Sequence, residues 1–308
     1  MDNFRTGTTP TGYPILNIND LKIHHPDVNI FISVVKEKRK VQQQLLDMGF
    51  KEKQIFTDID FLWAQCELPD FQVYLNGYEW AYNYFTDDIS KSIVIKRIER
   101  YLFGEPLEKT TEDIEYFKKD IIKLTDDEIF IDGGCFTGDT IDEFLKQING
   151  KFNHIYSFEP DNNNYLKAAA SFKDHKNIEL INKGLWSHET ELQFHVFNSG
   201  RNSFLADHVY SKNIVTVPVT SLDSVFIDRQ KSEYPTFIKL DIEGSELEAL
   251  KGAKKIIREN HPKMAICAYH KPEDIYELPQ LINDFDKNYK LQLVQHRDDV
   301  NETVLYAV

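Results

Sequence analysis

The sequence predicts an α/β protein with a mostly parallel sheet and helices on both faces, preceded by a smaller N-terminal α/β region. Three observations predict this fold class. From residue 126 onward, short apolar runs alternate with amphipathic stretches, a pattern typical of parallel strands joined by helices. A cluster of glycines separates the first of these runs from the stretch that follows it. Two further apolar runs close the sequence with no helix between them, which predicts a C-terminal antiparallel hairpin.

The N-terminal region, residues 1–110, contains one predicted strand, helix, strand unit. Residues 29–35 (NIFISVV) are a β-branched run, residues 36–50 have helical spacing with Gly49 as the expected stop, and residues 53–56 (KQIF) form the second run. An incomplete nucleotide-binding fold is one interpretation. Because no glycine loop accompanies the unit, we expect it to serve in docking or homo-oligomerisation.

An aromatic-rich stretch follows at residues 67–88. We interpret its rings as core and interface packing, with a substrate platform as the alternative. The spacing then predicts a helix from residue 92 that ends before Gly104 and Pro106.

The main domain, residues 111–308, has five short apolar runs that predict buried strands, at residues 128–132, 154–160, 177–184, 236–244 and 263–270. Most of these runs alternate with predicted helices, at residues 139–148, 162–172, 245–260 and 272–285. Polar residues alternate with apolar ones in a further pair of strands, at residues 191–197 and 213–220, and the closing hairpin pairs residues 290–296 with 302–308.

The composition argues against several classes of partner. The chain has 36 Lys plus Arg against 50 Asp plus Glu, a net charge of −14 over 308 residues, so binding to nucleic acid or to an anionic membrane is not expected. Its three cysteines have no CxxC spacing, so neither a disulfide framework nor a zinc site is predicted. With no apolar stretch long enough to span a bilayer and no signal-like N-terminus, we expect a soluble, cytoplasmic protein.

The glycine cluster occupies the place where open α/β sheets bind ligands, between the end of a strand and the start of a helix. Glycines there permit positive φ, and the helix start presents free N–H groups to an anion. The strand ends in Asp132, whose carboxylate suits a cationic group, so the pair of features suits a zwitterionic ligand. A tight connection with no ligand is the alternative. The spacing D-x-G-x-x-x-G matches neither the G-x-G-x-x-G loop of nicotinamide enzymes nor a P-loop.

The next predicted strand ends in Glu159, one strand and helix further on. An acidic side chain at this position binds both ribose hydroxyls in nucleoside-binding α/β folds. Together, the glycine turn and the acidic strand end favour a nucleoside cofactor.

At this point the sequence resembles a known family. The motifs FIDGGCFTGDT, YSFEPDNNNY, NKGLWS, VTSLDS, FIKLDIEGSELEALKGA and AICAYHKPEDIYELPQLI follow one another in the order and character of FkbM-family S-adenosylmethionine-dependent O-methyltransferases. The resemblance covers about residues 125–308. It implies a class I methyltransferase (Rossmann-like) sheet with a reversed last strand, and methylation of sugar hydroxyls in bacterial surface polysaccharides or natural products.

The resemblance also implies site residues. Glu159 would bind the ribose, Lys183 and Gly184 would lie by the adenine, and Asp139 with Thr140 would meet the methionine part or only begin the helix. The family often has Ala-Asn where this chain has Gly134-Cys135, so Cys135 is interpreted as a backbone contributor rather than a nucleophile. The full set expected at the cofactor is Asp132, Gly133, Gly134, Cys135, Phe136, Thr137, Gly138, Asp139, Thr140, Glu159, Pro160, Lys183, Gly184 and Asp241.

Methyl transfer to an alcohol needs an oriented oxygen and a group that takes its proton. Asp241, Glu243 and His270 end the fourth and fifth predicted strands and are the candidate catalytic residues, with His270 or Asp241 as proton acceptor. Each has a structural alternative, as a cap or strand-end group. A metal held by these three is chemically reasonable, but their spacing has no dedicated metal pattern, so no metal is predicted. Lys239 is expected to pair with Asp132 or another buried carboxylate.

A loop between the two alternating strands is the expected acceptor site. Arg201, Asn202 and Ser203 lie in it and suit a sugar or its phosphate, with an ordinary exposed loop as the alternative. His296 in the last hairpin is expected to be structural or to border the cleft. Two other function classes stay open: a non-catalytic partner protein with this fold, which would show no turnover, and an NAD-dependent sugar oxidoreductase, which a comparison of NAD with S-adenosylhomocysteine would distinguish.

Overall fold

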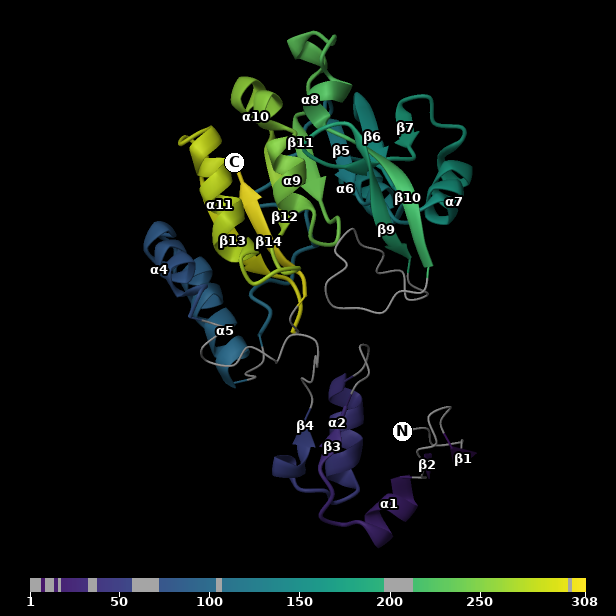
Figure 1. Ribbon diagram of the computed structural model, residues 1–308, viewed down its shortest axis with the longest axis vertical. Helices are drawn as coiled ribbons and strands as arrows, with labels where there is room; N and C mark the ends of the chain where they lie inside the picture. The colour runs from purple at the N-terminus through teal and green to yellow at the C-terminus, as the bar shows by residue number, and fades with distance from the viewer. Residues whose placement is uncertain are drawn as a thin grey trace. The chain divides into compact units, whose positions relative to one another are not determined.

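The computed structural model describes residues 7–8, 14–15, 18–32, 38–56, 72–103, 107–196, 213–298 and 301–308. The chain divides into two compact units, one made of Met1–Glu67 with Glu99–Glu105 and the other of Leu68–Ile98 with Pro106–Val308 (Figure 1). Residues 68–98 thus belong to the second unit, and the domain boundary expected at residue 110 stays a prediction. The docking or oligomerisation role expected of residues 1–110 stays a prediction.

The first unit contains a parallel strand pair with a helix between the strands in sequence, as predicted. β3 pairs in parallel with β4, and Gly49, with φ of 85°, follows α2 in the left-handed conformation that commonly ends helices. Its small apolar core consists of Ile18, Ile30, Ile32, Leu45, Phe50 and Ile55. The elements in chain order are β1 (Gly7–Thr8), β2 (Pro14–Ile15), α1 (Ile18–His24), β3 (Ile30–Phe31), α2 (Lys38–Asp47), η1 (Glu52–Gln54) and β4 (Ile55–Phe56).

The second unit is built on a seven-stranded sheet in the order β13-β14-β12-β11-β5-β6-β7. All pairs from β12 to β7 are parallel, and β14 runs antiparallel to both of its neighbours. The strands are β5 (Ile129–Gly133), β6 (His154–Phe158), β7 (Ile178–Ile181), β11 (Phe237–Leu240), β12 (Lys263–Cys267), β13 (Leu291–Gln295) and β14 (Thr303–Ala307). The predicted parallel sheet, the reversed last strand and the closing hairpin are confirmed.

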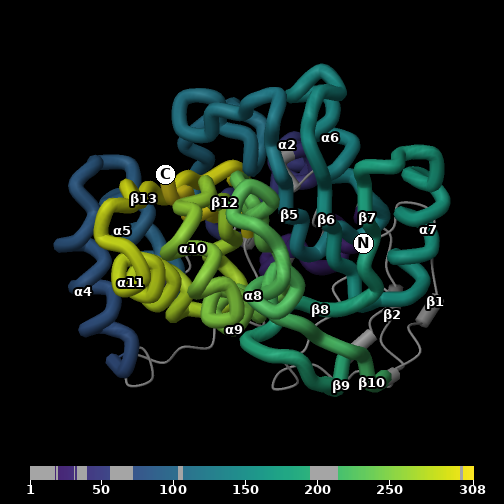
Figure 2. Tube along the Cα trace, turned by 90° about the horizontal axis from the view of Figure 1, so that it is seen from above, coloured from purple at the N-terminus to yellow at the C-terminus, as the bar shows by residue number. Residues whose placement is uncertain are grey.

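Helices cover both faces of this sheet, because its central strands are apolar on both sides. Figure 2 shows α6 on one face and α9, α10 and α11 on the other. Under α6, an aromatic group packs Phe130 of β5 against Phe144 and Phe237, with ring centroids 4.5 and 5.0 Å away. The helices of this unit are α4 (Leu75–Tyr84), α5 (Asp88–Phe103, shared with the first unit), α6 (Asp139–Gln147), α7 (Asn162–Phe172), α8 (Leu222–Val225), α9 (Glu246–Lys251), α10 (Lys254–Asn260) and α11 (Asp274–Phe285), with η2 (Lys231–Glu233).

The aromatic-rich stretch supplies α4, which packs on α11. Tyr78 is buried, donates a hydrogen bond from its hydroxyl to the carbonyl of Pro272 at 2.9 Å, and meets the Tyr276 ring edge-on at 5.9 Å. The interpretation of these rings as packing groups is confirmed for Tyr78.

The helix predicted over residues 245–260 is in fact two helices, α9 and α10. The break falls at Gly252, where a Cβ would stand 2.2 Å from the carbonyl oxygen of Trp186. The segment around Trp186 therefore packs directly against the backbone at the break. Asp223 from α8 then accepts the backbone N–H groups of Lys255 and Ile256 and caps α10. A cap provided from about 30 residues away leaves no local sequence signal.

A second, three-stranded sheet lies in the same unit. β10 (Asn213–Thr220) pairs antiparallel with β9 (Thr190–Val196) and parallel with the short β8 (Gly184–Leu185). The predicted alternating strand pair is therefore confirmed.

Candidate active site

A left-handed turn joins β5 to α6 at the carboxyl edge of the sheet. Gly134, Phe136 and Gly138 have φ of 76°, 50° and 97°. A Cβ on Gly134 would lie 1.9 Å from the backbone oxygen of Asp241, and one on Gly138 would lie 2.4 Å from the Phe172 ring. The protein's own packing therefore requires glycine at both positions. The shape of the turn alone does not identify a ligand.

The start of α6 agrees with the sequence analysis in position. The helix begins at Asp139 and Thr140, and its N-cap residue is Gly138, so no side chain caps its first turn at this position. Asp139 is exposed and Thr140 half-exposed, so both stand where the free N–H groups of the first turn face outward. Cys135 is fully buried, and burial raises the pKa of its thiol, which agrees with a packing rather than a nucleophilic role.

Asp132 lies beneath the turn and is fully buried. Lys239, opposite it in the register of β5 and β11, places its Nζ 3.0 Å from Asp132 Oδ1 and donates to the carbonyls of Gly133 and Gly134 at 3.0 and 2.8 Å. The predicted ion pair is confirmed. Burial alone would lower the pKa of Lys239, but Asp132 and Asp241 outweigh it and raise that pKa, so the lysine stays charged. Asp132 thus pairs with the lysine whose Nζ bonds to the turn, and a contact between Asp132 and a cofactor stays a prediction.

Glu159 connects the end of β6 to this turn. Its Oε2 accepts the backbone N–H of Phe136 at 2.9 Å, and its Oε1 accepts that of Asp161 at 2.8 Å. The glycine turn and the acidic strand end therefore meet at one place, as the sequence analysis requires. Glu159 is 6% exposed. Burial raises its pKa to about 7, although the two N–H donors act in the opposite direction.

A cavity of about 570 Å³ adjoins the same strand end. Its lining includes Pro160 and Asn182, together with residues 161–163 at the start of α7 and residues 214–218 of β10. Asn182 also donates to the carbonyl of Glu159 at 2.8 Å. Next to it, Lys183 places its Nζ 3.4 Å from Glu189. Gly184 pairs with Val219 in the small sheet. Asn182 therefore belongs to the candidate adenine-side wall, while contacts from Lys183 and Gly184 stay predictions.

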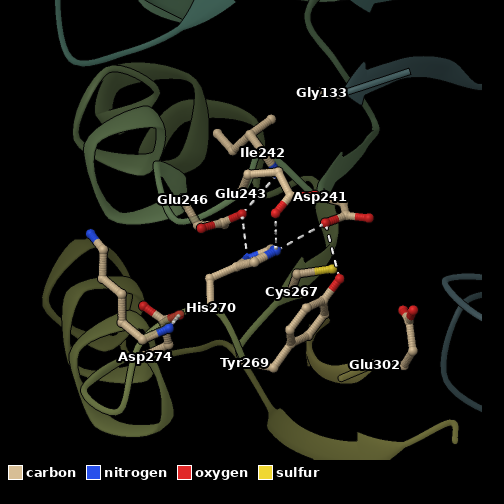
Figure 3. A network of polar contacts seen from close by, with 12 residues as sticks. Gly133, Asp241, Ile242, Glu243, Glu246, Cys267, Tyr269, His270, Asp274 and Glu302 are labelled. Carbon is tan, nitrogen blue, oxygen red and sulfur yellow. Dashed lines mark hydrogen bonds and ion pairs between the residues drawn. The ribbon is translucent and has the colours of Figure 1, made fainter. Parts of the chain in front are cut away.

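The three candidate catalytic residues lie together (Figure 3). The Nε2 atom of His270 is 3.5 Å from Asp241 Oδ1 and 3.6 Å from Glu243 Oε2, and its Nδ1 atom is 3.1 Å from Glu246 Oε1. Asp241 and Glu243 follow β11 and His270 follows β12, whereas Glu246 begins α9, so all four lie at the carboxyl edge of the sheet. Glu243 has φ of 54°, a conformation that costs energy in a non-glycine residue and is often found at functional sites.

Two tyrosines hold Asp241. Tyr116 donates its hydroxyl to Asp241 Oδ2 at 3.0 Å, and Tyr269 donates to Oδ1 at 3.3 Å. The side chain of Asp241 is 27% exposed, against 8% for His270. Asp241 is thus the more accessible of the two and has a fixed orientation.

The charged groups of the cluster shift one another's pKa values. Burial alone lowers the pKa of His270, but Glu246, Asp241 and Glu243 raise it to about 10, so the imidazole is protonated near neutral pH in this arrangement. Partial burial acts to raise the pKa of Asp241, but Lys239 and His270, with the Tyr116 hydroxyl, outweigh it and lower that pKa. Asp241 is therefore ionised.

Sequence reasoning missed Glu246, Tyr116 and Tyr269. Glu246 stands inside the quoted motif, and its complete burial is the signal that only the structure shows. Conversely, the loop residues Arg201, Asn202 and Ser203 lie outside the described residues.

His296 contacts the Tyr306 hydroxyl at 2.9 Å, and burial lowers its pKa to about 4, as expected of a structural histidine.

A family model described as the methyltransferase FkbM domain matches residues 133–291, more than half of the chain. The chain belongs to the FkbM methyltransferase family. No curated protein matches the sequence.

Among solved structures, the FkbM methyltransferase from Methylobacillus flagellatus KT has a TM-score of 0.74 at 23% identity, over 100% of this chain and 82% of that one. This likeness confirms the class I methyltransferase fold. The fibrillarin of Aeropyrum pernix, solved with bound S-adenosyl-L-methionine, has a TM-score of 0.39 at 13% identity over 62% of this chain and 71% of its own. The Streptococcus mutans protein SMU.1697c, solved with SAH, has a TM-score of 0.34 at 14% identity over 62% and 94%. Neither is similar enough to support a statement about this FkbM-family chain.

No helix within the described ranges combines the length and the apolar character needed to cross a bilayer.

Proposed function

We propose that this FkbM-family methyltransferase transfers a methyl group from S-adenosylmethionine to a hydroxyl of a sugar or glycan precursor, in bacterial surface polysaccharide or natural-product biosynthesis in the cytoplasm. The observation that carries the proposal is the hydrogen bond from the Phe136 N–H to Glu159. It unites the glycine turn with the acidic strand end, the two features that a nucleoside cofactor needs.

The described residues fit this cofactor. Glu159 offers a nearly buried carboxylate for two vicinal hydroxyls, and Pro160 and Asn182 line the adjoining cavity, whose size suits an adenosine group. We assign the exposed first turn of α6, with Asp139 and Thr140, to the methionine end of the cofactor. When bound, S-adenosylmethionine supplies a methyl group on a positively charged sulfur.

Asp241 is the residue that we assign to the acceptor hydroxyl. It is ionised, partly exposed and held by two tyrosines, so it can accept the hydroxyl hydrogen bond and orient the oxygen. Both ring nitrogens of His270 face carboxylates, and its side chain is almost fully buried. We therefore propose that His270 positions the carboxylates of Asp241, Glu243 and Glu246. The proton of the acceptor hydroxyl passes to Asp241 or to a water molecule beyond it. In the overall exchange an O–CH₃ bond forms, an S–CH₃ bond breaks and one proton is released.

Calorimetry with S-adenosylhomocysteine tests the cofactor part. The wild type should bind it, and Glu159→Ala should weaken binding at least ~30-fold, since a carboxylate that accepts two hydroxyls contributes about 2 kcal/mol or more. Glu179→Ala, on the neighbouring strand and half-exposed, is the matched control and should bind like the wild type. No binding by the folded wild type would reject the proposal.

Mass spectrometry tests the acceptor part. Sugar-nucleotide and polysaccharide pools from cells with the wild type should contain species heavier by one CH₂ unit that are absent with Asp241→Asn. If the pools from cells with the wild type and with Asp241→Asn contain the same species, a sugar hydroxyl is rejected as the acceptor.

A further inference from the structure

Three side chains from separate segments meet at one point beside the proposed acceptor position. Asp241, Glu246 and His270 each offer one ligand atom, and these atoms all lie within 4.8 Å of one another. Asp241 follows β11, Glu246 begins α9 and His270 follows β12, so the sheet fixes their spacing (Figure 3). Two ligands on opposite sides of a transition metal are about 4.2 Å apart, since metal–ligand bonds are roughly 2.1 Å. The upper limit of 4.8 Å on the separations of the three ligand atoms is therefore close to the span of a bound ion.

Hydrogen bonding leaves part of this group unsatisfied. Within the described part of the chain, neither ring nitrogen of His270 makes a hydrogen bond of acceptable geometry, and Glu246 Oε2 has no hydrogen-bond partner. These atoms are buried, with the His270 side chain 8% exposed and that of Glu246 0%. The Nε2 atom points between Asp241 and Glu243 at 3.5 and 3.6 Å, too far for a good hydrogen bond. Buried polar atoms normally have partners, so this exception needs an explanation.

The charge around the group is also unbalanced. Three carboxylates, those of Asp241, Glu243 and Glu246, surround one imidazole. Lys239, whose charge acts on Asp241, is already paired with Asp132. Even with a protonated imidazole, the carboxylates outnumber the cations in the cluster, and a divalent cation would correct this.

We propose that Asp241, Glu246 and His270 bind one divalent transition-metal ion. Two carboxylate oxygens and one imidazole nitrogen are donors that suit Mn²⁺, Fe²⁺ or Zn²⁺ better than Ca²⁺, which prefers oxygen alone. The Glu246 oxygen on the side of the imidazole is Oε1, 3.1 Å from His270 Nδ1; it accepts the N–H of Ile242 at 2.8 Å and has a second lone pair for a metal ion. Asp241, at 27% exposure, is the side of the site that opens to the acceptor.

The catalytic role of this metal ion rests on the proposed function. A cation at this point would attract the oxygen of the acceptor hydroxyl and lower its pKa, so that the oxygen is a better nucleophile at neutral pH. The same cation would release the proton that His270 otherwise holds.

The test uses the full chain after dialysis against a chelator, with Mn²⁺ as the probe. Titration followed by the electron paramagnetic resonance of free Mn²⁺ should give one site per chain in the wild type. Asp241→Asn and Glu246→Gln should each weaken it at least ~10-fold, because each removes one anionic ligand. Glu248→Gln is the matched control on the same helix, where Glu248 pairs with Lys251 near the surface, and should leave affinity within about twofold of the wild type, as loss of a surface pair has little effect.

Two outcomes overturn the inference: no Mn²⁺ or Zn²⁺ binding at millimolar concentration, or binding that Asp241→Asn leaves unchanged. Asp241→Asn is the decisive variant because its side chain is partly exposed and its volume is kept, whereas Glu246 is buried. Binding of S-adenosylhomocysteine is measured on every sample. Cofactor-product binding without metal binding rejects the metal site alone, and metal binding without cofactor-product binding rejects the proposed function alone.

Discussion

The buried pair of Lys239 and Asp132 permits a quantitative prediction about stability. Lys239→Met keeps the length of the side chain but removes its charge, and leaves Asp132 unpaired in a fully buried position. It also removes the donor to the carbonyls of Gly133 and Gly134. Removing one partner of a buried ion pair costs about 3–5 kcal/mol. For a unit of this size, that loss lowers the Tm by roughly 6–20 °C.

The assay is thermal and urea unfolding of the wild type, Lys239→Met, Asp132→Asn and the double variant. The double variant should recover at least about half of the loss, because no unpaired charge is left buried. Lys251→Met is the control: Lys251 pairs with Glu248 at 2.6 Å but is 45% exposed, so its loss should cost less than about 1 kcal/mol. A Lys239→Met variant within 1 kcal/mol of the wild type, or a double variant no more stable than Lys239→Met, would refute the reasoning.

Three further predictions follow from the site. The pKa of Glu159 is raised to about 7, and its ionised form is the one that accepts two hydroxyls. The affinity for S-adenosylhomocysteine, measured by calorimetry, should therefore rise about tenfold from pH 6 to pH 8. Glu159→Gln should lose this pH dependence. Gly134→Ala should cost more than about 3 kcal/mol in urea unfolding, whereas Gly150→Ala should cost only about 1, since both have positive φ but only Gly134 meets a neighbouring backbone; equal losses would contradict the packing argument. With the third cysteine replaced by serine, Cys135 and Cys267 should resist iodoacetamide in the folded protein and react in urea, because burial raises the pKa of both thiols; labelling of the native protein in mass spectra would disprove their burial.

The strands of the main sheet could be predicted from the sequence because they are buried on both faces. In β5 and β11 every residue is buried, and apart from the paired Asp132 and Lys239 these strands contain only apolar residues and glycine. The residues at the carboxyl edge of the sheet could be predicted once the strands were known, because parallel strands end at the same edge. Glu159 and Asp241 were found in this way.

Features that depend on distant segments could not be predicted. Tyr116 lies in a segment with neither helix nor strand, with φ of 66°, so no periodicity indicates that its hydroxyl reaches Asp241. Glu246 looks like an ordinary first-turn acid of a helix until its burial against His270 is known. The break at Gly252 depends on Trp186, which no local pattern reveals.

The place of β14 has a consequence for how the protein folds. Among the described strands, β13 pairs only with β14, so this hairpin joins the sheet only when β14 pairs with β12. Until it does, β12 keeps one unpaired edge whose residues are almost all apolar and destined for the interior. An exposed edge of that kind invites pairing with other chains. Docking of the β13–β14 hairpin therefore covers an edge prone to aggregation, and chaperones that shield strand edges should raise the yield of refolding.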